Sequence, residues 1–212
     1  MALGISSLDS IEREKLDVCL DASVAINLLA TGYADKILCS KNLRFCVEEA
    51  VCSEIRLHPV DRTCAAPHLS ELFYNDHISL ERLRRSGEVE FLALVSGGLI
   101  GALGDGEAAT IALARQLRGI AAIDDQKAIR VACNRYTSPP LKIVSTLDII
   151  GRAEFAQEFA GVLDEVLLNA LQYARMRVPK RYEEWVRGRI GQDAFRKCNS
   201  IRLAARLASP SE

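Results

Sequence analysis

The sequence predicts an α/β protein in which helices cover both faces of a parallel sheet. Three observations support this prediction. Short apolar segments alternate with helical patterns over roughly the first 150 residues, as in strand–helix–strand units. Of all residues, 49% are hydrophobic, which is enough for a sizeable core, and the charged fraction of 26% argues against disorder. The length of 212 residues suggests one domain with an appendage.

The first half of the chain supplies two clear strand–helix units and one ambiguous region. We expect a short strand from Val18 to Leu20, followed by a helix from about Ser23 that stops at Gly32. A second strand and helix share the segment 42–58. The region 59–87 is polar and mixed, with a helix predicted near 68–85, and the apolar run 89–95 ("VEFLALV") is typical of a strand.

The second half continues the alternation and then becomes entirely helical. The glycine-rich stretch 96–106 predicts a loop, and Pro139-Pro140 precedes the last strand. The expected elements are a helix at 107–118, a strand at 119–124, a helix at 126–136, a strand at 141–146, and tail helices at 155–176 and 180–190. We therefore divide the chain into an α/β domain, residues 1–151, and a C-terminal helical extension, residues 152–212.

Composition and charge exclude several classes of protein. The formal net charge of −1 leaves no global basic field, so any nucleic-acid binding must use a local patch. The sequence has no signal-peptide pattern and no apolar run long enough for a membrane span. Seven scattered cysteines without a C-x-x-C pair favour free thiols in a reducing cytoplasm. His58, Cys64 and His68 match no closed zinc pattern, so we interpret their segment as a polar loop.

Acidic residues recur where strands pass into helices. They are Asp21, Asp105, Glu107, Asp124 and Asp125. The C-terminal ends of parallel strands share one edge of the sheet, so these acids should converge there. Glu54 would join them only if the end of its helix points to the same edge.

Helix capping is the alternative interpretation of each acid taken singly. Asp105 and Asp125 both stand where a cap is expected, whereas Ser23 looks better placed than Asp21 to cap the first helix. Because only one of Asp124 and Asp125 can cap a helix, the acids outnumber the caps. Crowded carboxylates repel unless a cation lies among them, and Mg²⁺ or Mn²⁺ suits such oxygen-rich sites. This chemistry is typical of phosphodiester hydrolysis.

Four motifs in this order resemble those of the PIN-domain nucleases, in particular the toxin-type ribonucleases of toxin–antitoxin pairs. They are "VCLDASVAINLL", "VEEAVCSEI", "GDGEAATIALA" and "AAIDDQKAIRVA". The resemblance implies a three-layer α/β/α fold and a divalent-metal-dependent endoribonuclease, located in the cytoplasm. It assigns catalysis to Asp21, Glu54, Glu107 and Asp125, and Mg²⁺ or Mn²⁺ binding to Asp21, Glu107, Asp124 and Asp125. It also implies an RNA substrate, an antitoxin protein as a possible partner, and a homodimer.

The tail and two further residues complete the predicted site. Segment 163–191 is similar to the C-terminal segment of a PIN subgroup whose second helix carries "YEE". Arg130 is predicted to reach an RNA phosphate from the helix after Asp125, with a surface or helix-pairing role as the alternative. Thr146, at the end of the last strand, could offer its hydroxyl to RNA or simply be a polar strand end. The apolar face of helix 155–176 suits a second copy, an antitoxin helix or the domain's own core.

Three other functions compete with the nuclease. A receiver-type phosphoacceptor domain needs its acidic pair early in the chain, but here the pair comes late. A haloacid-dehalogenase-type phosphatase needs Asp-x-Asp after the first strand, and "DAS" lacks the second Asp. A catalytically silent PIN fold that acts as a binding or scaffold module is the remaining alternative, although all four motif acids are present.

Overall fold

The computed structural model describes residues 15–97, 101–153 and 161–198, and it contains a five-stranded sheet. The strands are β1 (Leu16–Leu20), β2 (Leu43–Glu48), β3 (Ser79–Glu81), β4 (Ile120–Ala122) and β5 (Lys142–Val144). Their order in the sheet is β3-β2-β1-β4-β5, and every neighbouring pair is parallel. The predicted α/β class with a parallel sheet is therefore confirmed.

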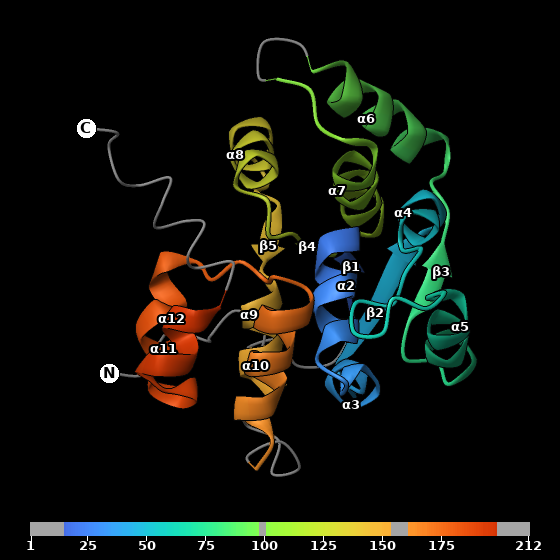
Figure 1. The fold of residues 1–212 in the computed structure, drawn as a ribbon. Helices are drawn as coiled ribbons and strands as arrows, with labels where there is room; N and C mark the ends of the chain where they lie inside the picture. Colours follow the sequence, from blue (N-terminus) through green and yellow to red (C-terminus); the bar gives the residue numbers. More distant parts are fainter. Residues whose placement is uncertain (1–14, 98–100, 154–160, 199–212) are drawn as a thin grey trace.

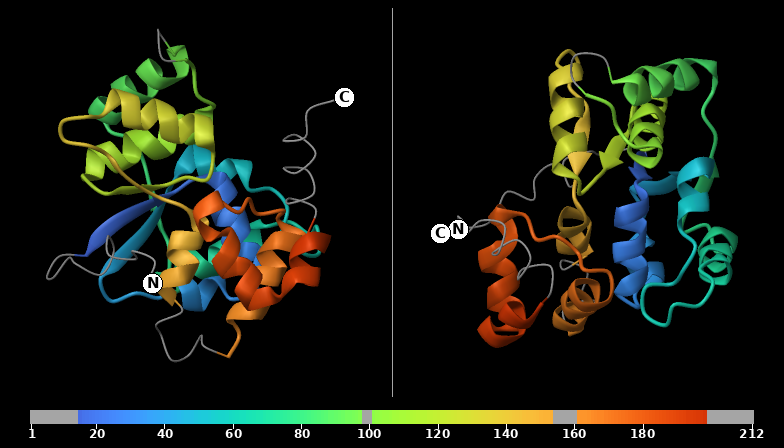
Figure 2. Two further views of the ribbon diagram at one scale, coloured as in Figure 1. Left: turned by 90° about the vertical axis from the view of Figure 1, so that its left-hand side faces the viewer. Right: turned by 45° about the horizontal axis from the view of Figure 1, so that its top comes forward.

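Helices cover both faces of this sheet and give three layers (Figure 1). One face carries α2 (Ala22–Ala30), α3 (Ala34–Leu38), α9 (Thr146–Ala153) and α10 (Leu163–Tyr173). The other carries α6 (Arg85–Ser96), α7 (Asp105–Leu117) and α8 (Gln126–Arg135). Near the β3 edge lie α4 (Glu49–Glu54) and α5 (Ala66–Tyr74), and the tail adds η2 (Lys180–Tyr182), α11 (Glu183–Ile190) and α12 (Gln192–Lys197). Figure 2 shows α6, α7 and α8 grouped away from the tail helices.

The two layers of core form because successive strand residues point to opposite faces of the sheet. Val18 and Leu20 of β1 pack in the core under α2, α9 and α10, whereas Cys19 between them packs under α7 and α8. All three are at most 1% exposed. The strand is apolar on both faces, which is the signature of a covered parallel sheet.

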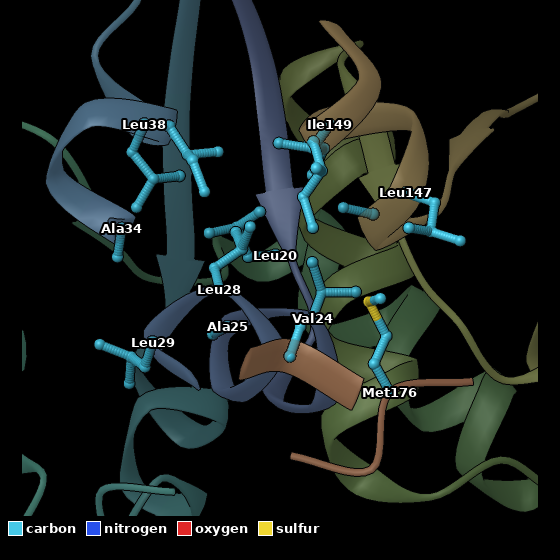
Figure 3. Packing of buried hydrophobic residues seen from close by; sticks show 14 of the residues in the cluster. Leu20, Val24, Ala25, Leu28, Leu29, Ala34, Leu38, Leu147, Ile149 and Met176 are labelled. Carbon is cyan, nitrogen blue, oxygen red and sulfur yellow. The ribbon is translucent and has the colours of Figure 1, made fainter. Parts of the chain in front are cut away.

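The tail packs into the same core as the sheet rather than forming a separate unit. Figure 3 shows Met176, just after α10, among Val24 of α2 and Leu147 of α9. Beyond it, the hydroxyl of Tyr182 donates to Asp148 of α9. Arg181 adds an ion pair to the same carboxylate, with 2.6 Å between Nη2 and Oδ2. The extension is thereby fixed to the α/β domain by apolar burial and by a buried hydroxyl.

The prediction of a strand at 89–95 is wrong, because this segment belongs to helix α6. Its inward-facing residues are Gly87, Phe91, Leu94 and Val95, which follow helical spacing against α7. Val89 and Leu92 are 64% and 61% exposed and break the expected polar outer face. An apolar run with apolar residues on both sides of a helix looks like a strand when periodicity is the only guide.

The predicted helix at 68–85 is also wrong in its second half. Helix α5 ends at Tyr74, and Ser79–Glu81 form the edge strand β3 beside β2. Asp76, in the turn between them, has a left-handed backbone with φ of 54°, which no helix can contain. Helices α3 and α9 were not expected. The other predicted strands and helices are present with shifts of a few residues at their ends, except that the tail helix predicted at 155–176 begins at Leu163, after a turn at 161–162.

The apolar face of the long tail helix belongs to the domain's own core. Leu163, Val166 and Leu167 of α10 are all 0% exposed. The first part of that predicted helix, with Phe155 and Phe159, lies outside the described residues. The described part of the face is therefore not available to a second copy of the chain or to an antitoxin helix, which corrects the expectation of self-association through it.

All seven cysteines are free, as predicted. In the segment that suggested a zinc fragment, a bridge between Leu57 and Cys64 closes a loop, and the ring of His58 stacks on that of His68 in α5 with centroids 4.2 Å apart, while Cys64 is exposed. Across the described segments, no helix has the length and apolar character needed to cross a bilayer.

Candidate active site

The acids singled out in the sequence gather at the C-terminal edge of the sheet. Asp21 directly follows β1, and Asp125 follows β4 by three residues. Glu107 lies in the first turn of α7, whose N-terminus faces the same edge. Glu54 ends α4 and reaches the first turn of α7 beside Gly106. The fold thus brings together four residues that span more than 100 positions in the chain.

Asp21 is held in one orientation by its own helix. It is 5% exposed, and its Oδ2 accepts hydrogen bonds from the Ser23 backbone N–H at 3.2 Å and the Ser23 hydroxyl at 2.5 Å. Asp21 is therefore the N-cap of α2. The expectation that Ser23 takes this position is wrong, because the serine lies inside the helix and supports the aspartate instead.

Glu107, not Asp105, completes the N-terminus of α7. The N-cap residue is Gly104, and Asp105 is the first helical residue, so the predicted cap is wrong by one position. Glu107 Oε2 accepts the Gly104 N–H at 3.2 Å, which is half of a capping box. Its other oxygen, Oε1, accepts no hydrogen bond from a described residue.

Glu54 has no capping role. It lies at the C-terminal end of α4, where the helix dipole disfavours a negative charge. A Cβ added to Gly106 would meet both Glu54 carboxylate oxygens at 2.9 Å, so the carboxylate rests directly against the start of α7. Within the described segments, no donor makes a hydrogen bond to it. Glu54 is therefore placed at the site by the packing of α4 on α7.

The adjacent Asp124 and Asp125 have different surroundings. Asp125 caps α8 through Oδ1, which accepts the backbone N–H groups of Lys127 at 2.7 Å and Ala128 at 2.9 Å. Asp124 uses both oxygens inside the protein: Oδ1 accepts the Thr146 N–H at 2.9 Å, and Oδ2 accepts the Thr146 hydroxyl and the Asn27 amide. Asp124 thus ties the end of β4 to α2 and α9.

The same network corrects the role predicted for Thr146. This residue is 0% exposed, and its hydroxyl donates to Asp124. A buried hydroxyl that is committed to a carboxylate cannot meet an RNA strand, so Thr146 positions Asp124 instead. Arg130 is exposed on α8, and its contact with RNA stays a prediction.

Burial and repulsion from neighbouring carboxylates raise the pKa of four of the acids at this edge. Burial is the main cause for Asp21, Glu54, Glu107 and Asp124, whose pKa values all lie above their ordinary values. Repulsion from Asp21 raises the pKa of Glu54, Glu107 and Asp124 further, and Asp125 acts in the same way on Asp21 and Glu107. The shared electrostatics show that these groups form one acidic cluster.

The donor set fits a hard divalent cation, although it is not assembled around one. Carboxylate oxygens are the ligands that Mg²⁺ and Mn²⁺ prefer, and a cation would relieve the repulsion described above. Within the described segments, however, no three His, Cys, Asp or Glu side chains already have an arrangement that could hold a metal ion. Several oxygens are turned toward backbone or hydroxyl donors.

Two residues of the site were missed in the sequence. Asn27 of α2 is 5% exposed and donates from Nδ2 to Asp124 Oδ2 at 2.9 Å and to Thr146 Oγ1 at 3.1 Å. Its signal is a polar residue on the apolar stripe of "SVAINLLA". Lys127 is the second, because its charge lowers the pKa of Glu107 while its Nζ donates to the Ala102 carbonyl. No sequence pattern distinguishes it from an ordinary surface lysine.

We compared the chain with protein-family models, with curated proteins and with solved structures, and none of the three comparisons gave a match. Any functional assignment therefore depends on the residues and the geometry described above.

Proposed function

We propose that the protein is a PIN-type, divalent-metal-dependent endoribonuclease. The observation that carries this proposal is Glu54. It stands at the unfavourable end of its helix, caps nothing, and is repelled by Asp21, yet α4 holds it against the first turn of α7. Asp21, Asp125 and Glu107 have capping roles that could explain them singly, but Glu54 has none. A fold that keeps such a carboxylate within electrostatic range of Asp21 and Asp105 supports a role for it in binding a cation.

The chain's own residues have distinct roles in this proposal. Asp21, Glu107 and Asp125 would hold Mg²⁺ or Mn²⁺, as the sequence motifs imply. Asp124, the fourth ligand expected from the sequence, uses both oxygens in hydrogen bonds to Asn27 and Thr146, so we assign its place to Glu54. Such an ion, when bound, supplies a water of lowered pKa and stabilises the negative charge of in-line phosphodiester cleavage. Ser23 keeps Asp21 in one rotamer, because its hydroxyl and its N–H both donate to Oδ2. Asn27 and Thr146 donate hydrogen bonds to Asp124 and hold its backbone in place. The next residue, Asp125, is thereby kept in its orientation.

RNA rather than another phosphodiester is the substrate that the sequence motifs imply. An antitoxin partner, a homodimer and a cytoplasmic location likewise stay predictions from that resemblance. The apolar face of α10 is used internally, so a partner would need a different surface. Val89 and Leu92, on the outer side of α6, are among the exposed apolar side chains of the described structure that such a surface could use.

Purified protein should cut a fluorescently labelled single-stranded RNA when Mn²⁺ or Mg²⁺ is added and not in excess EDTA. Glu54→Gln keeps the size of the side chain and removes its repelled charge, so it should abolish most cleavage while leaving the melting temperature of the metal-free protein unchanged or higher. Glu49→Gln, at the other end of α4, is a matched control that should cleave normally. Cleavage that persists in EDTA, or an active Glu54→Gln protein, would refute the proposal.

The absence of a preassembled three-residue metal group in the described structure favours one second candidate, a PIN-like module that binds RNA or protein without cleaving it. The two candidates differ in response to metal. A nuclease should gain thermal stability on Mn²⁺ addition through linkage between binding and folding. A silent module should show neither that gain nor cleavage.

A further inference from the structure

A cavity lies next to the acidic cluster and has the opposite charge. Its volume is about 680 Å³, and Glu54 forms part of its wall. The rest comes from α2, from the loop between α4 and α5, and from the C-terminal end of α10 with the residue after the helix cap. Figure 1 shows α2 between these two segments. Glu54 belongs to both, so the cavity and the acidic cluster adjoin at this residue.

Three arginines line this cavity, namely Arg56, Arg62 and Arg175, and we call it the arginine groove. All three are exposed, and none has an ion pair with a described carboxylate. Some other arginines of the described chain, such as Arg44, Arg82 and Arg135, contact an acidic residue within 3 Å, whereas others outside the groove, such as Arg85 and Arg118, also lack an ion pair with a described carboxylate; what distinguishes the groove is that three such arginines line one cavity. The groove therefore gathers unneutralised positive charge in a protein whose formal net charge is −1.

Two of these arginines hold an unfavourable backbone conformation. Arg62 has φ of 62° and Arg175 has φ of 56°, which is the left-handed region that favours glycine. Arg62 lies in the turn where its N–H donates to the His58 carbonyl at 3.0 Å. Arg175 follows the cap residue of α10, a position that helices commonly fill with glycine. Arg118, outside the groove, has the same conformation with φ of 55°, so the backbone geometry by itself assigns no function; it shows that both groove positions would accept glycine without strain.

The groove also offers an exposed aromatic ring. Tyr173 is 45% exposed and lines the groove at the end of α10, and Leu57 is 44% exposed on the opposite loop. Sites that bind single-stranded nucleic acid combine cationic side chains for the backbone with aromatic rings on which bases stack. The same combination is present here beside the acids.

We propose that the arginine groove binds the single-stranded RNA that flanks the cleaved bond, with its phosphates on Arg56, Arg62 and Arg175 and a base stacked on Tyr173. The inference rests on the proposed function, because the acidic cluster would take the phosphate that is cleaved. It assigns to the C-terminal extension the role of completing the substrate path. The extension contributes Tyr173 and Arg175, and the α/β domain contributes Arg56 and Arg62.

Binding is measured in EDTA, so that it does not depend on cleavage. The probe is a fluorescein-labelled oligoribonucleotide of mixed sequence, and the readout is anisotropy at several salt concentrations. Arg62→Gly with Arg175→Gly removes two guanidinium groups and relaxes both left-handed residues, so the melting temperature should not fall. Each lost phosphate contact should reduce the slope of log affinity against log salt by about 0.7.

Arg118→Gly is the matched control. Arg118 is exposed, has φ of 55°, and precedes β4, which places it at the opposite edge of the sheet. Away from the groove, this variant makes the same kind of change in charge and backbone as each of the two groove substitutions, and it should bind RNA like the unaltered protein. Tyr173→Ser should weaken binding about tenfold with no change in the salt slope, since stacking is not an ionic contact.

The outcomes separate the groove from the nuclease. If the double variant and Arg118→Gly bind RNA equally well, the proposal that the arginine groove binds RNA is refuted, even if the protein cleaves RNA. If the double variant loses binding and no metal supports cleavage, the groove stands and the nuclease proposal fails. If poly-glutamate displaces the oligoribonucleotide as well as unlabelled RNA does, the groove is a site for an acidic protein segment and the RNA assignment is overturned.

Discussion

Gly106→Ala tests whether the position of Glu54, and not merely its presence, matters for the site. Gly106 is the second residue of α7, and its Cα packs against the Glu54 carboxylate. An added methyl group would lie 2.9 Å from both carboxylate oxygens, whereas ordinary van der Waals contact begins at 3.4 Å. Subtracting the two distances shows that the carboxylate must retreat by about 0.5 Å. The side chain is at the end of its helix and can make this movement by rotation.

The expected change in stability is small because two effects oppose each other. Alanine in place of glycine stabilises a helix by about 0.5–1 kcal/mol. Forcing a side chain off its preferred rotamer costs about 0.5–1.5 kcal/mol. The net change should lie within about 1 kcal/mol, which corresponds to roughly 2–4 °C in melting temperature for a chain of this size. The effect on function should be larger, since misplacing a catalytic group by 1 Å can cost about a hundredfold in rate.

The assay pairs RNA cleavage in Mn²⁺ with thermal unfolding of the same samples. Gly106→Ala should lose about tenfold in cleavage rate and keep its melting temperature. Gly188→Ala is the control, because Gly188 lies in α11 and an added Cβ there meets nothing within 4 Å. It should raise the melting temperature by a few degrees and cleave normally. A Gly106→Ala protein that is as active as the control would show that Glu54 does not need its observed position.

Three further predictions concern charge and the tail. Asp21→Asn should reduce cleavage by at least about a hundredfold yet leave the metal-free protein as stable or more so, because asparagine is an equally good N-cap; a large fall in melting temperature would make Asp21 structural. The raised pKa values of Asp21, Glu54, Glu107 and Asp124 mean that the folded state holds protons more tightly than the unfolded state. At low pH these groups therefore add to the free energy of unfolding. That contribution is lost as the pH rises above the ordinary pKa values, 3.8 for aspartate and 4.5 for glutamate, and passes through the raised pKa values of the folded state. In EDTA the unaltered protein should therefore lose more stability over this range than Asp21→Asn, and equal losses in a pH series of melting curves would contradict this. Tyr182→Phe should cost about 1.5 kcal/mol through the lost hydrogen bond to Asp148, and an unchanged melting temperature would show that apolar packing alone holds the tail.

Local patterns were sufficient where a segment's own residues decide its structure. The strand at Leu16–Leu20 is apolar on both faces, and the helix after it begins at a residue that can cap. The meeting of Asp21, Glu107 and Asp125 at one edge follows from the parallel order of the strands, because every strand in such a sheet ends on the same side. The class of the fold and three of the four clustered acids were therefore predictable without coordinates.

Other features of the structure depend on contacts between elements that are separated in the sequence. The segment 85–96 is a helix because its inner residues meet α7, although its composition suits a strand equally well. Thr146 looked like a polar strand end, but the chain turns there and places its hydroxyl on Asp124. In both cases the deciding neighbour is distant in sequence, so periodicity and spacing carry no information about it.

The sequence by itself determined that this protein is an α/β fold with a parallel sheet and an edge rich in carboxylates, because alternation and capping are local properties of the chain. Only the tertiary structure decided that Glu54 joins that edge, through the packing of α4 on Gly106. It alone also brought Arg56 and Arg62 to one cavity with Arg175, more than 100 residues further along the chain. Contacts of this kind depend on how helices pack against one another. They are set by the shapes of the packed surfaces and not by the local conformational preferences of each segment.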